Sequence, residues 1–514
     1  MTVTIGVDVG TQGSKAIVYT TTGLQVGKAY APHTISYPGP GLAEMDANQL
    51  VDATVSAISQ AVREATESGI NVADIAGIAL SGILVGQVLL DEDSRVLYPI
   101  ITSLDTRSAD LAAKAARELE PLWLQESGTS TLDAYAAPFM LGWVRDNEPE
   151  IWARVKRTVS VAPFVSARLA GLSQSEMYTE PTHVSGWMVG WDASTGGFSS
   201  HQLDAFGIPE DILPPIVPSD SIIGELTSEF ANLTGVPAGT PIVAGAGDVM
   251  QSNLASGLLR AGQACDSAGT TSILTVGVEG IIPEVTNVPG MLYSNGTLPG
   301  QSFYWGYIRA GGLSLRWFRD QVANLAHDEH AYSDFDSLAE SEEAGSGGVL
   351  FLPYLAGGNP DSPNASGTWL GLHSGTNTGQ LWRSALESIA FEYSSYLDVF
   401  HRTGTELEEV LVTGGGGNSN VWNSIKASVT GIPWRKPPRV DGPPLANAAL
   451  ANVALGLSES VEKQLMEWTA GGEIVQPNQS DNALYQQVGE IRTGLLRGPM
   501  LDVFEQVRNL RKLG

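Results

Sequence analysis

Short apolar runs alternate with turn residues over the first thirty positions, a pattern typical of a strand meander. Strands are predicted near residues 3–8, 14–20 and 24–30, separated by a Gly-Thr-Gln-Gly turn and a Thr-Thr-Gly turn. Asp46 then precedes an expected amphipathic helix, whose apolar positions fall on one face: Leu50, Val51, Val55, Ile58 and Val62. Strand and helix patterns continue to alternate to about residue 250, which predicts the α/β class.

The second half of the chain partly repeats the first. Asp8-Val9-Gly10-Thr11 opens a glycine turn between two strand patterns, and Ser267-Ala268-Gly269-Thr270 does the same later. Two such turns, each near the start of a half, predict two similar α/β domains facing each other across a cleft. We place the domains at 1–252 and 253–460, followed by a helical extension at 461–514. An apolar stripe in this extension is expected to dock on its own domain, a dimer contact being the alternative: Met500, Val503, Phe504, Val507 and Leu510.

Composition narrows the functional classes. Hydrophobic residues make up 43% of the chain and charged residues 16%, which is enough apolar material for sizeable cores. The net charge of -28 argues against nucleic-acid or membrane partners, because affinity for either needs clustered Lys and Arg. Cys265 is the only cysteine, so no internal disulfide or multi-thiolate metal site is expected. A cytoplasmic protein is expected, since no basic-apolar leader opens the chain and no apolar run approaches the roughly 20 residues that span a bilayer.

The turn after the first predicted strand carries groups suited to a phosphate. Glycines let the backbone turn tightly and present consecutive N–H groups to an anion. Thr11 and Ser14 add hydroxyl donors, and Asp8 places a carboxylate where a phosphate-bound magnesium ion would sit. An ordinary hairpin with an Asp turn would show the same pattern. The second turn, at 269–271, favours the phosphate interpretation, because a nucleoside triphosphate needs donors from both sides of a cleft.

Two further stretches suggest a binding site for the flat ring of a nucleotide and a catalytic base. Four glycines at 414–417 lie between an apolar strand pattern and a helical pattern, where a flat ring could approach the backbone and meet a helix N-terminus. No Gly-Lys-Ser/Thr follows, so this is not a Walker loop. Asp248 follows an apolar strand that ends in Gly245-Ala246-Gly247. Its carboxylate could accept a proton from a hydroxyl that attacks a γ-phosphate, and a helix N-cap is the alternative use.

Taken together, these residues resemble the FGGY carbohydrate kinase family, which has the actin-like ATPase (ribonuclease H-like) fold. The most specific stretch is 367–372 followed by 380–387, Gly-Thr-Trp-Leu-Gly-Leu and Gln-Leu-Trp-Arg-Ser-Ala-Leu-Glu, which resembles the second family signature. Residues 137–150 resemble the first signature, with Met140 in place of the usual lysine, and 41–46 and 310–317 are also similar to the family. The resemblance runs from residue 3 to about 457. It implies ATP and Mg²⁺ as cofactors, a small sugar or polyol as substrate, and dimerisation as a plausible state.

The resemblance also implies roles for individual residues. Asp8 would serve the magnesium and Asp248 would be the catalytic base, while three residues would serve the phosphates: Thr11, Gln12 and Ser14. In the second domain, the phosphate chain and adenosine would be held by Gly269, Thr270, Gly311, Gly415, Gly416 and Asn420. The sugar would lie near an Asp-x-Arg segment and a glycine loop, represented by Asp105, Arg107, Gly82, Leu84 and Val85.

The chain is most similar to the xylulose kinases but departs from them around the sugar. Their loop typically reads Ser-Gly-Gln-Met-His-Gly, whereas Leu84-Val85 replaces the Met-His pair here and cannot donate a side-chain hydrogen bond. Val249 replaces the Asn that usually follows the catalytic Asp, Ser103-Leu104 replaces a Trp-Asn pair, and Ser424 replaces a Gln near the adenine. Each lost buried partner costs about 1–3 kcal/mol. A less hydroxylated or differently configured substrate is therefore expected, with a pentulose such as xylulose as the default.

Two other classes share part of this pattern. An actin-like ATPase without small-molecule chemistry would share the glycine turns but would not need Asp248, the Asp-x-Arg segment or the two signatures. A sugar-binding regulator or pseudokinase would bind ATP without turnover; the altered loop favours it, whereas the presence of Asp8 and Asp248 favours an active enzyme. His183 lies in a segment that is polar and close to substrate in the family, and is a further candidate contact. The sequence therefore predicts an ATP-dependent kinase that phosphorylates a hydroxyl of a small sugar or polyol.

Overall fold

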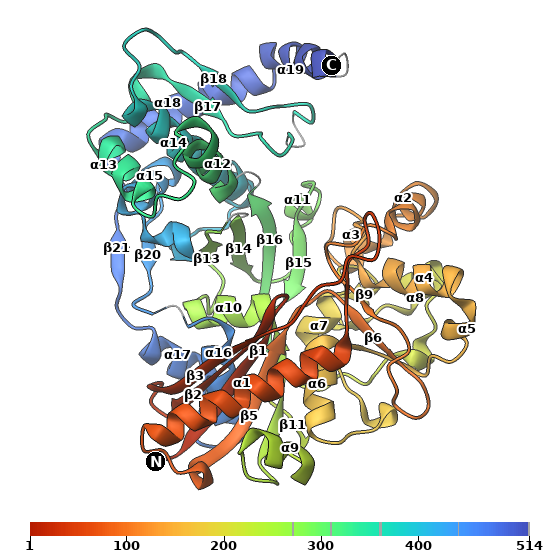
Figure 1. The fold of residues 1–514 in the computed structure, drawn as a ribbon. Helices are drawn as coiled ribbons and strands as arrows, with labels where there is room; N and C mark the ends of the chain where they lie inside the picture. Colours follow the sequence, from red (N-terminus) through yellow and green to blue (C-terminus); the bar gives the residue numbers. More distant parts are fainter. Residues whose placement is uncertain (270–271, 309–310, 359–361, 440, 512–514) are drawn as a thin grey trace. The chain divides into compact units, whose positions relative to one another are not determined.

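The computed structural model describes residues 1–269, 272–308, 311–358, 362–439 and 441–511 (Figure 1). The chain divides into two compact units, each made of segments that are distant in sequence. Unit 1 comprises Met1–Ala261, Val278–Tyr304 and Asp441–Ala470, and unit 2 comprises Gly262–Gly277, Trp305–Val440 and Gly471–Gly514. Unit 1 thus takes two segments from beyond the predicted boundary at residue 252. Among the described residues, no helix combines the length and apolar character that crossing a membrane requires.

Unit 1 is built on a mixed sheet with the strand order β11-β12-β5-β1-β2-β3. β2 pairs antiparallel with β1 and β3, whereas β5 pairs parallel with both β1 and β12. The strands are β1 (Val3–Val9), β2 (Gly13–Thr20), β3 (Gln25–Pro32), β5 (Ile75–Gly82), β11 (Ile222–Glu225) and β12 (Pro241–Gly247). The three strands predicted from the first thirty residues are therefore present.

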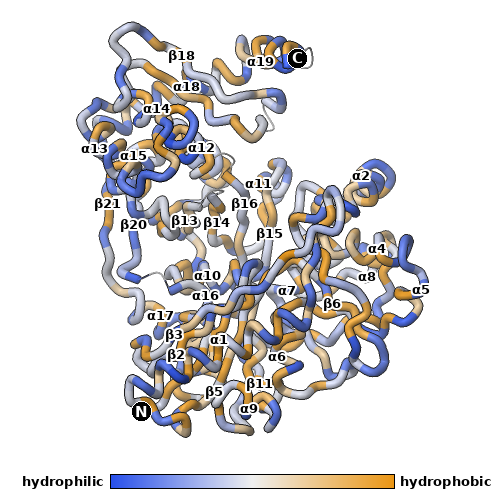
Figure 2. Tube along the Cα trace, in the orientation of Figure 1, coloured by the Kyte–Doolittle hydropathy of each residue, from blue (hydrophilic) through white to orange (hydrophobic). Residues whose placement is uncertain are grey.

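Alternating side chains of this sheet build a core on each face. On β2, Ala16 and Val18 pack in one cluster with α1 (Ala47–Glu67), whereas Ile17 and Tyr19 pack in another with α16 (Pro443–Ala454). The period of two that separates the clusters is the geometry of a strand buried on both faces. The strands of the sheet carry runs of apolar colour in Figure 2. Asp46 caps α1 as predicted, because its side chain accepts from the Asn48 N–H at 2.8 Å.

The remainder of unit 1 consists of shorter strands and helices. Its small strand pairs are β4 (Glu44–Met45) with β7 (Ile100–Ile101), β6 (Gln87–Leu90) with β8 (Arg157–Ser160), and β9 (Trp191–Asp192) with β10 (Gly197–Phe198). The helices are α2 (Ala109–Glu118), α3 (Leu122–Glu126), α4 (Ala137–Asn147), α5 (Pro149–Trp152), α6 (Val161–Leu169), α7 (Pro181–Ser185), α8 (Ser200–Phe206), α9 (Ser228–Thr234), α10 (Asp248–Ser256), α11 (Pro283–Thr286) and α17 (Val461–Trp468). The strand β15 (Leu292–Asn295) also belongs to this unit.

Unit 2 has its own mixed sheet, in which the strands run in the order β16-β14-β13-β19-β20-β21. They are β13 (Gln263–Ser267), β14 (Ser272–Val278), β16 (Ser302–Ile308), β19 (Glu409–Thr413), β20 (Trp434–Lys436) and β21 (Glu473–Val475). The pair β17 (Leu350–Leu352) and β18 (Thr368–Leu370) and a set of helices complete the unit: α12 (Gly311–Trp317), α13 (Ala331–Glu340), α14 (Thr378–Arg402), α15 (Asn420–Thr430), α18 (Gln479–Leu496) and α19 (Pro499–Arg511).

The two sheets repeat one local topology. In unit 1 a hairpin, β1-turn-β2, has a parallel neighbour β5 beside its first strand. In unit 2 the hairpin formed by β13 and β14 has a parallel neighbour β19 beside its first strand. The prediction of two similar α/β domains is confirmed by this correspondence.

The C-terminal stripe docks only in part on unit 2. Met500 and Phe504 of α19 are buried in a cluster with Leu352 and Tyr354. Val503 and Leu510 are 45% and 67% exposed. The docking surface is therefore one narrow edge of the helix, because only residues four positions apart face the cluster.

A buried ion pair lies in the core of unit 2. The Lys426 Nζ of α15 donates to the Asp266 Oδ2 of β13 at 2.7 Å, and both side chains are fully buried. The Tyr393 hydroxyl donates to the other oxygen of Asp266 at 2.7 Å. The ammonium also lies 3.8 Å from the ring centroid of Trp422 and 4.8 Å from that of Trp434. Both charges are compensated, but neither can be removed alone without leaving the other in an apolar core.

Lys426→Met is expected to lower the free energy of unfolding of unit 2 by about 3–5 kcal/mol, because it leaves the Asp266 carboxylate buried without its cation. The double variant Asp266→Asn/Lys426→Met should recover part of this loss. Urea unfolding followed by tryptophan fluorescence measures both. The argument would be contradicted if the double variant lost as much free energy of unfolding as Lys426→Met and Asp266→Asn lose together.

Candidate active site

The first glycine turn lies between β1 and β2 and is held from the side of β3. The Tyr30 hydroxyl donates to the Gln12 carbonyl at 2.9 Å, and the His33 Nε2 bonds the Gly10 carbonyl at 2.8 Å. The amides of Thr11 and Gln12 take no part in the β1–β2 ladder, whose last pair is formed by the residues flanking the turn. Gln12 is exposed and Thr11 is half-buried. The turn therefore has the form predicted for an anion site, with its carbonyls fixed elsewhere.

Ser14 belongs to the same turn, but its side chain points into unit 1. It is fully buried, and its hydroxyl shares a hydrogen bond of 3.0 Å with the Thr54 hydroxyl of α1. Because α1 engages this hydroxyl, Ser14 offers a phosphate only its backbone. The sequence could not reveal this, since Thr54 lies 40 residues further along the chain.

Asp8 lies near the end of β1 and is oriented by a chain of donors. The Ser81 hydroxyl donates to the Asp8 Oδ1 at 2.9 Å, and the Asn447 Nδ2 of α16 donates to the Ser81 hydroxyl at 2.9 Å and to the Val7 carbonyl at 2.7 Å. Lys15 stands opposite Asp8 in the β1–β2 ladder. Burial raises the pKa of Asp8 above its ordinary value, in spite of the bond from Ser81 and the positive charge of Lys15. Asn447 and Lys15 are functional candidates that no motif identified, and Ser81, the first residue of the sugar loop, was not connected with Asp8.

Asp248 begins α10 directly after β12. Its Oδ1 accepts the Val249 N–H at 2.7 Å, so the helix start provides one donor. Burial, and then the negative charge of Asp8, raises the pKa of Asp248. The structure thus brings together the two acids that the sequence assigned to the metal and to the base. They meet because β1 and β12 both run parallel to β5, which places their carboxyl ends at one edge of the sheet.

This pair of carboxylates fits a divalent cation. The charge of Asp8 raises the pKa of Asp248, and a nearby cation would relieve this repulsion. Within the described ranges, no group of three or more His, Cys, Asp or Glu side chains could hold a metal ion. The carboxylates of Asp8 and Asp248 suit magnesium, which is commonly bound by one or two carboxylates together with water and phosphate oxygens.

The loop that follows β5 lies beside the strand that leads to Asp248. Gly82 ends β5, Leu84 is 6% exposed and Val85 is half-buried. A Cβ atom on Gly247 would lie 2.1 Å from the Leu84 Cδ2. Leu84 therefore packs directly on the residue before the proposed base, so its apolar character bears on the site.

The charged groups of Asp105 and Arg107 bond each other and neighbouring residues of the protein. Arg107 donates from its Nε to the Asp105 Oδ1 at 2.9 Å and from its Nη2 to the Asp105 Oδ2 at 2.7 Å. The Arg107 Nη2 also donates to Glu44 at 2.7 Å, and the Nη1 donates to Tyr98 at 3.1 Å. The Ala43 N–H donates to Asp105 as well, at 2.7 Å. These contacts tie the segment around β4 to the segment around β7, so the pair holds two loops together.

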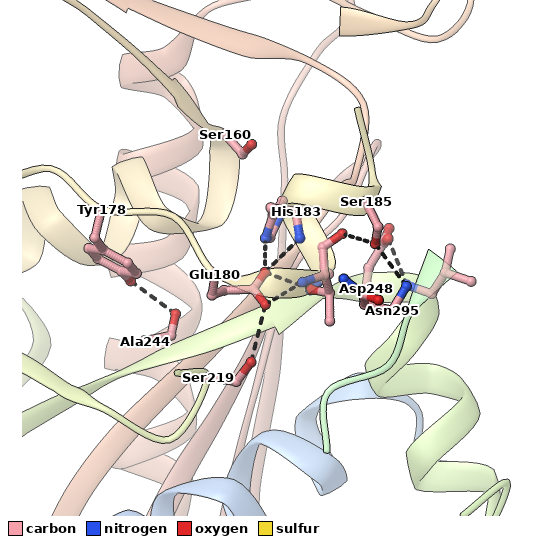
Figure 3. Close-up of polar contacts among 12 residues, drawn as sticks. Ser160, Tyr178, Glu180, His183, Ser185, Ser219, Ala244, Asp248 and Asn295 are labelled. Carbon is pink, nitrogen blue, oxygen red and sulfur yellow. Dashed lines mark hydrogen bonds and ion pairs between the residues drawn. The ribbon is translucent and has the colours of Figure 1, made fainter. Parts of the chain in front are cut away.

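His183 is directed into unit 1. Its side chain is fully buried, its Nδ1 lies 2.5 Å from the Glu180 Oε1, and its Nε2 is buried without a hydrogen-bond partner. Figure 3 shows the contacts around Glu180. A ring without accessible surface does not present a donor to a ligand in this structure. His183 is thus a partner of Glu180, which the sequence analysis did not single out.

A cavity of ≈ 510 Å³ lies within unit 2 and brings the second and third glycine stretches together. A backbone hydrogen bond joins these two stretches, since the Gly416 N–H donates to the Ala268 carbonyl at 3.0 Å. The Gly312 N–H donates to the Gly269 carbonyl at 3.2 Å and joins the start of α12 to the second stretch. Three predicted residues line the cavity: Gly269, Gly415 and Gly416. Gly311 is buried next to the lining residue Gly312, and Thr270 lies outside the described residues. Asn420 is exposed at the start of α15 and is not among the lining residues.

Aromatic and acidic side chains form the rest of the cavity wall. Trp382 and Trp422 line it, and both are nearly fully buried. The Trp382 Nε1 donates to the Asp336 Oδ1 at 2.9 Å, and burial raises the pKa of Asp336. The cavity therefore offers flat apolar surface, glycine backbone and one anchored carboxylate, a combination suited to a nucleoside. Asp336 was not predicted, because it lies in a helix with no glycine motif.

The two mixed α/β units with glycine turns define the actin-like ATPase fold. Residues 3–255 match the N-terminal domain of the FGGY family of carbohydrate kinases, and residues 265–455 match its C-terminal domain. The chain therefore belongs to the FGGY family of carbohydrate kinases. The family prediction is confirmed, and with it the general assignment as a carbohydrate kinase of a family that uses ATP.

Similar proteins act on several substrates. The chain is 26% identical to the xylulose kinase of Staphylococcus epidermidis over 489 residues, 94% of each chain. It is 26% identical to the L-xylulose/3-keto-L-gulonate kinase of Escherichia coli over 485 residues, again 94% of each. The crystal structure of xylulose kinase from Rhodospirillum rubrum superimposes with a TM-score of 0.86 at 27% identity, covering 96% of this chain and 97% of that one. The two family models establish the family, and these relatives are named for different substrates.

Ser81→Ala is expected to reduce kcat/KM about tenfold, because Asp8 loses a hydrogen bond to its charged form worth about 1.5–3 kcal/mol. Ser14→Ala serves as the contrast: its hydroxyl contacts Thr54, so its main effect should be on stability. A coupled assay of ADP release and thermal unfolding measure the two effects. Equal loss of turnover in both variants would show that Ser81 has no special role at Asp8.

Proposed function

We propose that this protein transfers the γ-phosphoryl group of ATP to a hydroxyl group of a small sugar or polyol. One observation carries the proposal: Asp8 and Asp248 lie at one edge of the unit 1 sheet, where the charge of Asp8 raises the pKa of Asp248, beside the loop that contains Leu84. Two carboxylates that interact in this way favour an active enzyme over a chain that has lost turnover. The regulator interpretation therefore receives no support from the site.

Asp248 is proposed as the base. Its carboxylate would accept a hydrogen bond from the attacking hydroxyl, orient it, and take its proton as the new bond to phosphorus forms. A raised pKa makes the carboxylate a better proton acceptor than a free aspartate, and a loose transition state demands little more than this positioning. The start of α10 fixes the carboxylate through the Val249 N–H.

Asp8 is proposed to hold the magnesium ion, with Ser81, Asn447 and Lys15 fixing and balancing its charge. When bound there, magnesium would neutralise charge on the phosphates. The backbone of the first turn, at Thr11 and Gln12, would bind phosphate oxygens, and the cavity in unit 2 would bind the nucleoside through its glycines.

The substrate is proposed to lack a hydroxyl, or to hold it differently, where xylulose kinases place their Met-His pair. Leu84 and Val85 carry no donor, and the buried position of Leu84 beside Gly247 leaves apolar surface there. A pentulose such as xylulose remains the default substrate.

Asp248→Asn is expected to lower kcat by about 10²–10⁴-fold, the usual contribution of a general base. The fold should be unaffected or slightly more stable, because a neutral amide beside Asp8 removes repulsion. ADP release, circular dichroism and calorimetric ATP binding measure these outcomes. Near-normal turnover would exclude Asp248 as the base, and loss of ATP binding would point to misfolding.

Val85→His is expected to raise turnover on D-xylulose at least several-fold relative to the wild-type protein, since it restores a donor worth about 1–3 kcal/mol. The test panel comprises D-xylulose, L-xylulose, D-ribulose, L-ribulose, glycerol, erythritol and D-gluconate. Val85→Leu is the matched control and should leave the preference unchanged. Strong wild-type turnover on D-xylulose would contradict the argument from Leu84 and Val85.

A further inference from the structure

The strand that delivers Asp248 is interrupted just before the acid. Val243 and Ala246 of β12 pair with Ala79 and Ser81 of β5, so three steps on one strand oppose two on the other. Gly245 occupies the extra position with a φ of +81, and a Cβ there would lie 1.7 Å from the Leu80 carbonyl oxygen. This is a β-bulge, where ladder bonds are disrupted and side contacts must fix the backbone.

Those side contacts come from α7 and its neighbours. The Tyr178 hydroxyl donates to the Ala244 carbonyl at 2.9 Å, and the Gly245 N–H donates to the Ser219 carbonyl at 3.0 Å. The Gly247 N–H, in the peptide that joins Ala246 to the residue before Asp248, donates to the Thr182 Oγ1 at 2.7 Å. Of these contacts, the one made by Thr182 is nearest the acid.

Glu180 fixes the direction of the Thr182 hydroxyl. The Thr182 Oγ1 donates to the Glu180 Oε1 at 2.6 Å, so its lone pairs are left for the Gly247 N–H. Glu180 also accepts from the Thr182 N–H at 2.8 Å, the His183 N–H at 2.9 Å and the Ser219 hydroxyl at 3.1 Å. Glu180, Thr182 and His183 are all fully buried, which strengthens the orientation because water cannot compete for these groups (Figure 3).

Gly247 has little room to shift. A Cβ on this residue would meet the Leu84 Cδ2 at 2.1 Å and the Thr182 Oγ1 at 3.4 Å. The Leu84 side chain and the Thr182 hydroxyl therefore both lie against Gly247. Loss of the hydroxyl would leave a buried N–H without a partner and would release the peptide on that side.

We propose that Thr182, oriented by Glu180, is a positioning residue for Asp248. The hydrogen bond to the Gly247 N–H holds the backbone just before α10 begins at Asp248. It thereby holds the Asp248 carboxylate, which faces the substrate hydroxyl. The inference rests on the proposed function, in which Asp248 is the base. Misplacing a reacting group by about 1 Å can cost about 10²-fold in rate.

The test compares Thr182→Val, Thr182→Ser and Ser219→Ala in the full-length protein. Thr182→Val keeps the shape but removes the acceptor, and is expected to lower kcat about 10–100-fold while the KM for ATP stays within about twofold. Thr182→Ser keeps the hydroxyl and should restore kcat to within about threefold of wild type. Ser219→Ala removes another donor to the same carboxylate and should leave kcat nearly unchanged.

A crystal structure of Thr182→Val supplies a readout that needs no activity, and is expected to show the Asp248 carboxylate displaced. If Thr182→Val does not fold, Thr182→Ala removes the acceptor without pressing a methyl group against the Gly247 N–H, and the same results are expected. Unchanged kcat with an unmoved carboxylate, or an equal loss in Ser219→Ala, would overturn the proposal. Wild-type protein that is silent on every sugar would count against the proposed function, while the displacement would still decide the role of Thr182.

Discussion

Two negative charges near one another are the constraint on which much of unit 1 depends. Asp8 and Asp248 are held at one edge of a sheet, and burial raises the pKa of each. Asp8 has a hydroxyl donor in Ser81 and a cation in Lys15, whereas Asp248 has the N–H of Val249 and the positive end of α10. These groups moderate the repulsion without removing it. The two carboxylates still favour a nearby cation, which the proposed magnesium ion would supply.

Several contacts fix the backbone around Asp8 and Asp248. The order of strands brings the ends of β1 and β12 together, and a bulge then sets the step at which β12 passes into α10. Glu180 accepts hydrogen bonds from α7 and from Ser219, and Leu84 also packs against Gly247. A polar network and an apolar side chain thus both contact this residue where the ladder is locally broken. In the proposed function, substrate selectivity and the placement of the base would share one structural element.

Local pattern predicted much of the fold. The strand meander, the cap at Asp46, the α/β class and the repeated glycine turns are encoded by neighbouring residues, so they could be predicted from a single chain. The meeting of Asp8 with Asp248 was also within reach, because parallel strands collect their carboxyl ends at one edge. The glycines of the unit 2 cavity followed from the same reasoning. Each of these predictions depends on short-range signals or on a general rule of topology.

Partners chosen by tertiary packing could not be predicted in this way. Asn447 reaches the Val7 carbonyl across 440 residues, and no motif connects the two. Arg107 donates hydrogen bonds to Asp105 and Glu44. Ser14 bonds Thr54, and His183 bonds Glu180. In each case the residue was visible, but the direction of its side chain depends on elements that fold against it.

The late position of α16 in the chain has a consequence for biosynthesis. This helix covers one face of the first sheet and supplies Asn447, yet it follows the first two segments of unit 2 in sequence. A nascent chain that has left the ribosome only as far as β12 exposes Ile17, Tyr19 and Ala79 without their cover. Unit 1 thus cannot mature in order from the N-terminus, and its sheet must wait, open on one side, until more than four hundred residues have been made.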